Sequence, residues 1–248
     1  MTAFSTRAIH NGEEPDFRDG ASGDVAVPIH LSTTFARLRA DSPTAGYEYT
    51  RSLNPTRKAL EEKLAALDGA KYGLAFSSGL AAASTVIISL LKAGDNVIGF
   101  DDLYGGTRRL LSNVFVNFDI SATYVDATKR ENIENAITSK SKLIWIESPT
   151  NPLMKLADIK AIAQIAHKHG LILVVDNTFL SPYFQRPLDL GADIVVYSTT
   201  KYIGGHSDVL GGSVVLNNED FYKKLAYNQN AVGAVLSPFD SYLTLRGA

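Results

Sequence analysis

The stretch YSTTKYIGGHSD spans residues 197–208 and directly follows the apolar run GADIVV at 191–196. The run is rich in β-branched residues and has no polar alternation, which is typical of a strand buried on both faces. Lys201 therefore lies a few residues past the end of a buried strand, among hydroxyl-bearing residues and glycines. A single lysine in such a place is usually a solvated surface charge. The residues that follow the other strands decide whether this lysine has a chemical role instead.

Apolar runs of the same kind recur along the chain and predict further strands. They lie at residues 72–76, 96–100, 120–125, 143–147, 171–176, 193–198 and 212–216. Helical patterns separate most of them: segment 54–67 has a proline near its start and leucines on one face, and segment 156–170 ends in basic residues and a glycine. Strands that alternate with helices predict an α/β protein with a mostly parallel, doubly wound sheet.

Composition limits the function classes. The 248 residues are 45% hydrophobic, which is enough for a full-sized core, and the net charge of -2 leaves no basic excess for nucleic acid or an anionic membrane. The chain has no cysteine for disulfides or thiolate metal ligands, and its N-terminus has no apolar stretch of signal-peptide length. We expect a cytoplasmic protein that binds a small molecule, with no nucleic-acid partner, no membrane partner and no metal.

Polar residues follow the predicted strands at the edge where doubly wound sheets bind ligands. Ser78, Gly79 and Leu80 begin a helix after strand 72–76, and a helix N-terminus suits a phosphate, although a plain N-cap explains them equally well. Tyr104 follows strand 96–100 and is either a core aromatic residue or a face for a planar ligand. Asn151 follows strand 143–147 in a loop stiffened by prolines.

The remaining strand ends complete a set. Asp176 ends strand 171–176, where a lone aspartate is usually a loop acceptor, and Ser198 and Thr200 precede Lys201. Phosphate donors, an aromatic face, a carboxylate and an amine are together the groups that pyridoxal 5'-phosphate requires. Its aldehyde needs a lysine Schiff base, its ring nitrogen an acid, and its phosphate a helix N-terminus. The set therefore predicts a pyridoxal phosphate site with Lys201 at its centre.

Seven motifs connect the chain with a known family. They are YEYTRSLNPTRKALEEKLAALDGA (47–70), FSSGLAAAS (76–84), DDLYGGT (101–107), ESPTNP (147–152), VVDNTFLSPYFQRPLDLGAD (174–193), YSTTKYIGGHSDVLGG (197–212) and SPFDSYLTLRG (237–247). With them the chain resembles the Cys/Met-metabolism group of fold-type I pyridoxal phosphate enzymes over essentially its whole length. The resemblance implies an aminotransferase-like sheet of seven strands, and a homotetramer built from dimers that share active sites.

The resemblance also implies a role for each matching residue. Lys201 would form the Schiff base, Asp176 would pair with the ring nitrogen, and Tyr104 would stack on the ring and donate a proton to the departing thiolate. These three are the predicted catalytic residues. The predicted cofactor-binding residues are Lys201, Asp176, Tyr104, Ser78, Gly79, Leu80, Ser198, Thr200, Asn151, Tyr49 and Arg51. Tyr49 and Arg51 would reach the phosphate of the neighbouring subunit, and His206 has no predicted catalytic role.

The predicted domains follow from composition and resemblance. Residues 1–55 hold Pro15, Pro28, Pro43 and Pro55 with little periodicity, which predicts an N-terminal arm, and the resemblance implies that the arm contacts the neighbouring subunit. Residues 56–235 would form the large cofactor-binding domain. Residues 236–248 would begin a linker helix to a C-terminal small domain that is absent from this chain and that carries the arginine for the substrate carboxylate.

The choice of reaction within the group stays open. In methionine γ-lyases the corresponding motif resembles LYGCT, with a cysteine where this chain has Gly106. The glycine therefore disfavours a methionine γ-lyase. The motifs look most like cystathionine γ-lyase, which would cleave L-cystathionine to cysteine, 2-oxobutanoate and ammonia. The alternative is cystathionine γ-synthase, in which cysteine replaces the leaving group of an activated homoserine. A non-catalytic homologue is less favoured because Lys201, Asp176 and Tyr104 are all present, and a nucleotide-binding protein is disfavoured because neither glycine-rich phosphate motif occurs.

Overall fold

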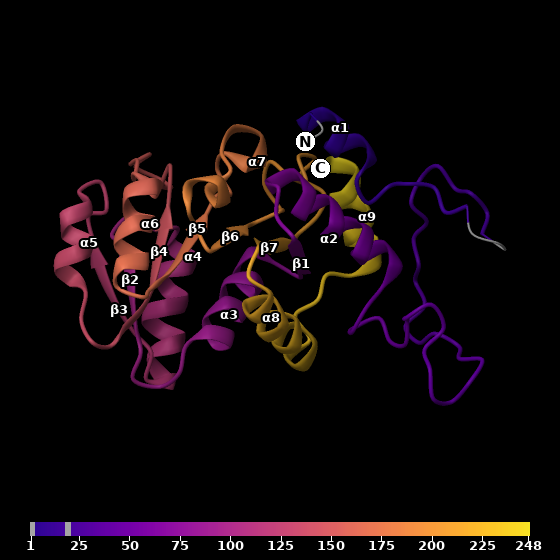
Figure 1. The fold of residues 1–248 in the computed structure, drawn as a ribbon, viewed down its shortest axis with the longest axis horizontal. Helices are drawn as coiled ribbons and strands as arrows, with labels where there is room; N and C mark the ends of the chain where they lie inside the picture. The colour runs from indigo at the N-terminus through magenta and orange to yellow at the C-terminus, as the bar shows by residue number, and fades with distance from the viewer. Residues whose placement is uncertain (1–2, 18–20) are drawn as a thin grey trace.

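The computed structural model describes residues 3–17 and 21–248. Its centre is a seven-stranded sheet with the strand order β1-β7-β6-β5-β4-β2-β3 (Figure 1). The strands are β1 (Tyr72–Phe76), β2 (Asn96–Phe100), β3 (Ser121–Val125), β4 (Ser141–Glu147), β5 (Ile172–Asp176), β6 (Ile194–Tyr197) and β7 (Gly212–Leu216). Within this sheet β7 pairs antiparallel with β1 and β6, and the other neighbouring strands pair parallel, so the prediction of a mostly parallel seven-stranded α/β sheet is confirmed.

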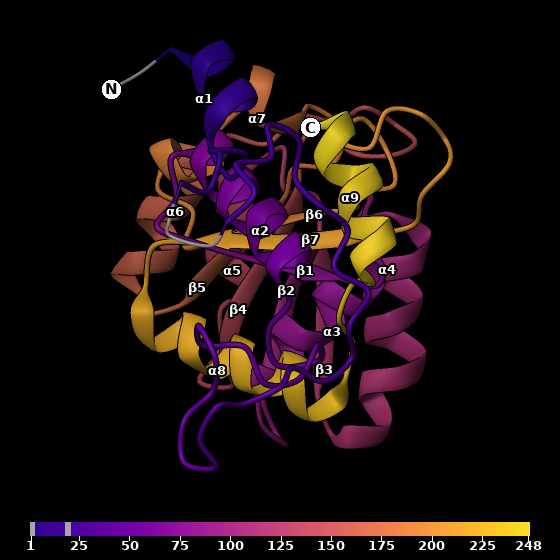
Figure 2. The same cartoon turned by 90° about the vertical axis from the view of Figure 1, so that its right-hand side faces the viewer.

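Helices connect the strands as the sequence pattern predicts. The α-helices are α1 (Phe4–His10), α2 (Pro55–Asp68), α3 (Gly79–Leu90), α4 (Gly105–Arg109), α5 (Arg130–Ala136), α6 (Ile159–Lys168), α7 (Ser181–Phe184), α8 (Glu219–Val232) and α9 (Pro238–Gly247). Shorter helical turns are η1 (Leu110–Val114), η2 (Phe115–Phe118) and η3 (Pro187–Leu190). Helices α2 and α9 lie side by side near the β1 edge (Figures 1 and 2).

The local sequence explains the course of α2. Asn54 caps its N-terminus by accepting from two backbone N–H groups, Pro55 occupies the first turn, and Gly69 ends the helix with a φ of 70° that favours glycine. Leu60 and Leu64 are fully buried on its core face, as the leucine spacing predicts. The helix is therefore held rigidly against β1, and the residues of its first turn become fixed points for the arm.

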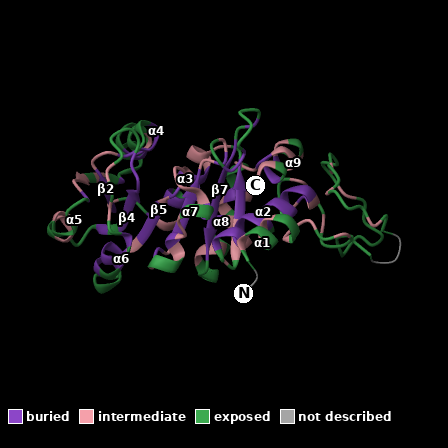
Figure 3. Cartoon of the chain, turned by 90° about the horizontal axis from the view of Figure 1, so that it is seen from above, coloured by how far each residue is buried: buried purple, intermediate pink, exposed green. Residues whose placement is uncertain are grey.

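The core lies within the central strands. Every residue of β2, β6 and β7 is buried, and Figure 3 shows buried residues along the strands with exposed ones on the surrounding helices. Strand β3 differs from the expectation that all strands are covered on both faces. Ser121 and Thr123 of β3 are exposed, because this strand is at the edge of the sheet and pairs only with β2.

The predicted arm extends beyond the β1 edge, opposite the β3 end of the sheet (Figure 1). It contains the short helix α1, which packs against α2, and an isolated bridge between Thr34 and Tyr49. The arm is also tied to α2 by an ion pair between Glu13 and Lys63. Residues 1–2 and 18–20 of the predicted arm lie outside the described residues, and the domain boundaries stay a prediction. Within residues 3–17 and 21–248, no helix is long and apolar enough to cross a membrane, and the cytoplasmic location also stays a prediction.

Candidate functional site

The carboxyl ends of the parallel strands open onto a cavity of about 980 Å³. All of the predicted site residues except the two in the arm line it: Ser78, Gly79, Leu80, Tyr104, Asn151, Asp176, Ser198, Thr200 and Lys201. They come from the ends of five strands that are far apart in the sequence. The position agrees with the general rule that doubly wound sheets bind ligands beyond the carboxyl ends of their strands.

The N-terminus of α3 forms one wall of the cavity. Ser78 caps the helix, with its Oγ accepting from the N–H of Ala81 at 3.0 Å. Gly79 and Leu80 occupy the first turn, where backbone N–H groups have no acceptor within the helix. A Cβ at Gly79 would lie 2.9 Å from the Cβ of Ser198, so the glycine lets the helix start approach the end of β6. Together the N–H groups and the adjacent hydroxyl make a site for an anion such as phosphate.

A carboxylate pair forms the floor of the cavity. Glu147 and Asp176 end the adjacent parallel strands β4 and β5, in register with each other. Burial and, to a lesser extent, the nearby charge of Asp176 together raise the pKa of Glu147 to about 8. Burial also raises the pKa of Asp176. No cationic side chain in the described part of the chain acts on Asp176, so this pair is suited to a ligand that brings a positive charge.

Thr178 orients Asp176 and connects it with the end of β6. Its hydroxyl donates to Oδ1 of Asp176 at 2.6 Å, and its backbone N–H donates to the same atom at 3.0 Å. The same hydroxyl accepts from the N–H of Ser198 at 2.8 Å. Glu147 and Thr178 are not among the residues predicted from the sequence. The last position of the predicted strand 143–147 was a signal for Glu147, because polar strand-end residues were the basis for the other assignments.

Lys201 lies in a loop whose backbone is held by its own hydrogen bonds. The Lys201 N–H donates to the carbonyl of Ser198 at 3.2 Å, and its carbonyl accepts from Gly205 at 2.9 Å. The hydroxyl of Thr200 donates to the carbonyl of Gly211 at 3.1 Å and accepts from the N–H of that residue at 3.0 Å. The Lys201 side chain is exposed to the cavity. A primary amine on a hydrogen-bonded loop therefore lines the same cavity as the α3 N-terminus and Asp176.

His206 makes a hydrogen bond within its own loop, whereas Tyr104 lines the cavity. The His206 ring donates from Nδ1 to the carbonyl of Gly204 at 2.7 Å, which is a hydrogen bond within the loop. Tyr104 is 44% exposed and lines the cavity, while its N–H donates to Oε2 of Glu147 at 2.8 Å. A Cβ at Gly106 would overlap the Tyr104 ring. Gly106 therefore leaves room for the aromatic ring at the cavity wall.

Tyr49 and Arg51 do not line the cavity of their own chain. Both are exposed in the arm, where the Arg51 guanidinium lies over the Tyr49 ring at 5.4 Å from its centroid. The structure thus separates these two predicted residues from the others. Their contact with a neighbouring subunit stays a prediction.

A buried polar network supports the site from behind. Asn177, which follows Asp176, donates through Nδ2 to the hydroxyl of Tyr197 at 2.9 Å. The Tyr197 hydroxyl donates to Oδ1 of Asp68 at 2.7 Å. On its other side, Asn177 accepts from Nε2 of Gln185 at 2.8 Å. The network joins the end of β5 to α2 and to the segment after α7, so the backbone that carries Asp176 is held from several directions.

This network predicts a pH-dependent stability. Burial raises the pKa of Asp68 to about 7, above its value of 3.8 in an unfolded chain. The folded state therefore binds more protons between these values, so the stability contributed by protonated Asp68 is complete below pH 4 and is lost as the pH rises to 7. Asp68→Asn should keep an acceptor for Tyr197 and remove this dependence.

The measurement is the urea midpoint of the full-length protein at pH 4 and pH 8. We expect the variant to match the parent near pH 4 and to exceed it at pH 8, by at most about 4 kcal/mol in free energy of unfolding. An equal difference between variant and parent at both pH values would contradict the assignment.

The fold and the cavity together define a class of protein. An anion site at a helix N-terminus, a pair of carboxyl groups, an aromatic ring and a lysine amine surround one space at the carboxyl edge of a mostly parallel sheet. These groups fit the phosphate, the cationic ring nitrogen, the ring face and the aldehyde of pyridoxal phosphate. The class is that of α/β enzymes that use this cofactor.

Comparison with known proteins gives the family. The family model of the Cys/Met metabolism PLP-dependent enzymes matches residues 5–248, and the chain belongs to this family. It is 55% identical to cystathionine gamma-lyase of Dictyostelium discoideum over 244 residues, which are 98% of this chain and 62% of that protein. It is 52% identical to a probable cystathionine gamma-synthase of Herpetosiphon aurantiacus, over 98% of this chain and 75% of that protein.

A solved structure agrees with both likenesses. The fold matches the crystal structure of cystathionine gamma-lyase from Lactobacillus plantarum complexed with L-serine, with a TM-score of 0.94 and 45% sequence identity. The match covers 99% of this chain and 63% of that structure. The chain therefore spans less than two thirds of the length of both proteins named as lyases.

Proposed function

We propose that the full-length protein catalyses pyridoxal phosphate-dependent γ-elimination of L-cystathionine, in which water enters and cysteine, 2-oxobutanoate and ammonia leave. The observation that carries this proposal is that Lys201, Asp176 and the N-terminus of α3 all line the same cavity. The high identity to proteins named cystathionine gamma-lyase supports the substrate. The enzyme class is then a carbon–sulfur lyase of the transsulfuration pathway.

Each residue has a proposed task. The N–H groups of Gly79 and Leu80 and the hydroxyls of Ser78 and Ser198, together with Thr200, would hold the cofactor phosphate. The cofactor, when bound, supplies an electron sink for the charge that remains when a proton leaves the substrate.

The remaining residues would act on the substrate or on the cofactor ring. Lys201 would hold the cofactor aldehyde, and its Nζ would take the proton from Cα of the amino acid. Asp176 would keep the ring nitrogen protonated, and Asn151 would border the ring. Tyr104 would cover the ring face and hold the proton that the departing sulfur needs. A fixed base and a fixed acid of this kind typically accelerate a reaction by about 10²–10⁴-fold each.

The second candidate is γ-replacement, because a relative at 52% identity is named a probable cystathionine gamma-synthase. The two reactions are distinguished by assaying the purified full-length protein with cystathionine, and separately with an acyl-activated homoserine plus cysteine. We expect release of 2-oxobutanoate from cystathionine to have the higher kcat/KM. A higher value for cystathionine formation would make the synthase the correct assignment.

The arm supports a proposal about assembly. Arg51 and Tyr49 are exposed and do not line the cavity of their own chain, which suits residues that complete the phosphate site of a neighbouring subunit in a homotetramer built from dimers. The arm to which they belong extends beyond the β1 edge (Figure 1). Because a guanidinium binds phosphate through two parallel N–H donors, Arg51→Ala should weaken cofactor binding by about tenfold or more. Titration of the cofactor-free, full-length protein measures this loss.

Mixed oligomers test whether the site is shared. Arg51→Ala and Lys201→Ala subunits are each inactive or weak alone, but a mixed dimer has one site with an intact Lys201 and a neighbour's intact Arg51. Co-expression of the two full-length variants, with separate tags to isolate the mixed species, should therefore restore part of the 2-oxobutanoate release. If isolated mixed dimers stay inactive, both residues belong to one subunit's site.

A further inference from the structure

The first turn of α2 fastens the arm at several points. The hydroxyl of Thr56 donates to the carbonyl of Pro28 at 2.7 Å and accepts from the N–H of His30 at 3.0 Å. Nδ2 of Asn54 donates to the carbonyl of His30 at 2.8 Å and to the hydroxyl of Thr50 at 3.0 Å. A rigid helix end thus holds two separate stretches of an otherwise irregular segment.

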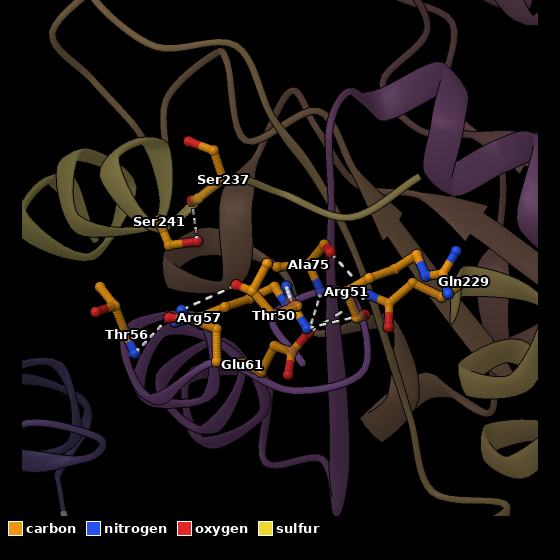
Figure 4. A network of polar contacts seen from close by, with 10 residues as sticks. Thr50, Arg51, Thr56, Arg57, Glu61, Ala75, Gln229, Ser237 and Ser241 are labelled. Atoms are coloured by element: carbon orange, nitrogen blue, oxygen red, sulfur yellow. Dashed lines mark hydrogen bonds and ion pairs between the residues drawn. The ribbon is translucent and has the colours of Figure 1, made fainter. Parts of the chain in front are cut away.

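Arg57 of α2 contacts the backbone of the arm at Thr50 and Arg51. Its side chain is only 1% exposed, and its guanidinium donates to the carbonyl of Thr50 at 2.7 Å and to the carbonyl of Arg51 at 3.3 Å (Figure 4). The guanidinium therefore binds two consecutive peptide carbonyls, those of Thr50 and Arg51. The same turn is closed by the N–H groups of Ser52 and Leu53, which both donate to the carbonyl of Tyr49 at 3.0 Å.

On the core side the guanidinium forms an ion pair, although its Nε has no hydrogen-bond partner. Nε of Arg57 lies 3.6 Å from Oε1 of Glu61, one helical turn further along α2. That oxygen accepts from the N–H of Ala75 in β1 at 2.9 Å, and Gln229 of α8 lies within 3.5 Å of it through Nε2 (Figure 4). Arg57 consequently links the arm turn to α2, the sheet and α8, although it does not line the cavity.

We propose that Arg57 is a positioning residue for the phosphate site of the neighbouring subunit. By holding the carbonyls of Thr50 and Arg51, it fixes the direction in which the Arg51 side chain leaves the arm. The inference rests on the proposed role of Arg51 and names the residue through which that role depends on the core. A lysine cannot replace Arg57, because one ammonium lacks the planar fork that spans two carbonyls while facing a carboxylate.

The first test is hydrogen exchange on the cofactor-free, full-length protein. In Arg57→Lys, the amides of residues 50–53 should exchange at least about tenfold faster than in the parent, because the turn opens locally, while the amides of β5 keep their protection. Lys58→Ala is the matched control, since Lys58 forms the corresponding i,i+4 ion pair with Glu62 on the exposed side of α2. Unchanged exchange at residues 50–53 in Arg57→Lys would overturn the inference.

The second test is a double-mutant cycle on cofactor affinity. Arg57→Lys should weaken pyridoxal phosphate binding by about tenfold in the parent and have little further effect in the Arg51→Ala background, because both changes remove the same contact. Additive losses overturn the inference and leave the role of Arg51 intact. Unchanged affinity in Arg51→Ala overturns the role of Arg51 and the inference with it. If Arg57→Lys does not fold, the double variant Arg57→Gln, Glu61→Gln takes its place in the cycle. This double variant leaves no buried unpaired charge.

Discussion

Lys201→Ala in the full-length protein should lower kcat for cystathionine cleavage by at least about 10³-fold, because it removes the base that takes the Cα proton. The change should leave the backbone of the loop intact, since the hydrogen bonds of residue 201 to Ser198 and Gly205 are made by its backbone. The proposed phosphate donors at the start of α3 are backbone N–H groups and a serine hydroxyl, and none of them belongs to Lys201. The variant should therefore still bind cofactor while losing activity.

Two measurements check this expectation. Single-turnover release of 2-oxobutanoate gives the loss of activity, and equilibrium dialysis with pyridoxal phosphate gives retained binding. Lys140→Ala is a suitable control, because Lys140 is exposed in the turn before β4 and does not line the cavity. Turnover of Lys201→Ala near the parental rate would exclude Lys201 as the catalytic base.

Asp176→Asn should slow the exchange of the substrate's Cα proton by about 10²-fold or more, with a much smaller effect on stability. Asparagine has nearly the same shape and keeps an oxygen that can accept from the hydroxyl and N–H of Thr178, which donate to Oδ1 of Asp176. It cannot, however, hold a negative charge beside the ring nitrogen. The neutral side chain also lacks the charge that helps to raise the pKa of Glu147, so this pKa should fall in the cofactor-free variant.

Proton NMR of an amino acid substrate in deuterated water measures the exchange rate, and the urea midpoint measures stability. Asp119→Asn provides the comparison, because Asp119 is exposed and its φ of 57° is one that asparagine adopts readily. Exchange in Asp176→Asn as fast as in the Asp119→Asn control would remove Asp176 from the site.

Much of the site was predictable from the sequence because its parts share one topological position. Residues that follow parallel strands meet at the same edge of a doubly wound sheet, so Tyr104, Asp176 and Lys201 could be assigned together before any distance was known. Glu147 and Thr178 were not predicted, because their importance comes from neighbours in space. Glu147 matters through its register with Asp176, and Thr178 through a hydroxyl that joins two strand ends.

The sequence by itself determined the local elements. The β-branched runs, the cap at Asn54 and the stop at Gly69 depend on backbone preferences within a few residues, so the strands and α2 were predictable from short segments. Only the tertiary structure decided that β7 runs antiparallel between β1 and β6, and that Arg57 grips the turn carrying Arg51. Such features depend on burial and on contacts between distant segments, where desolvation raises the cost of each unpaired charge and so selects which groups must meet.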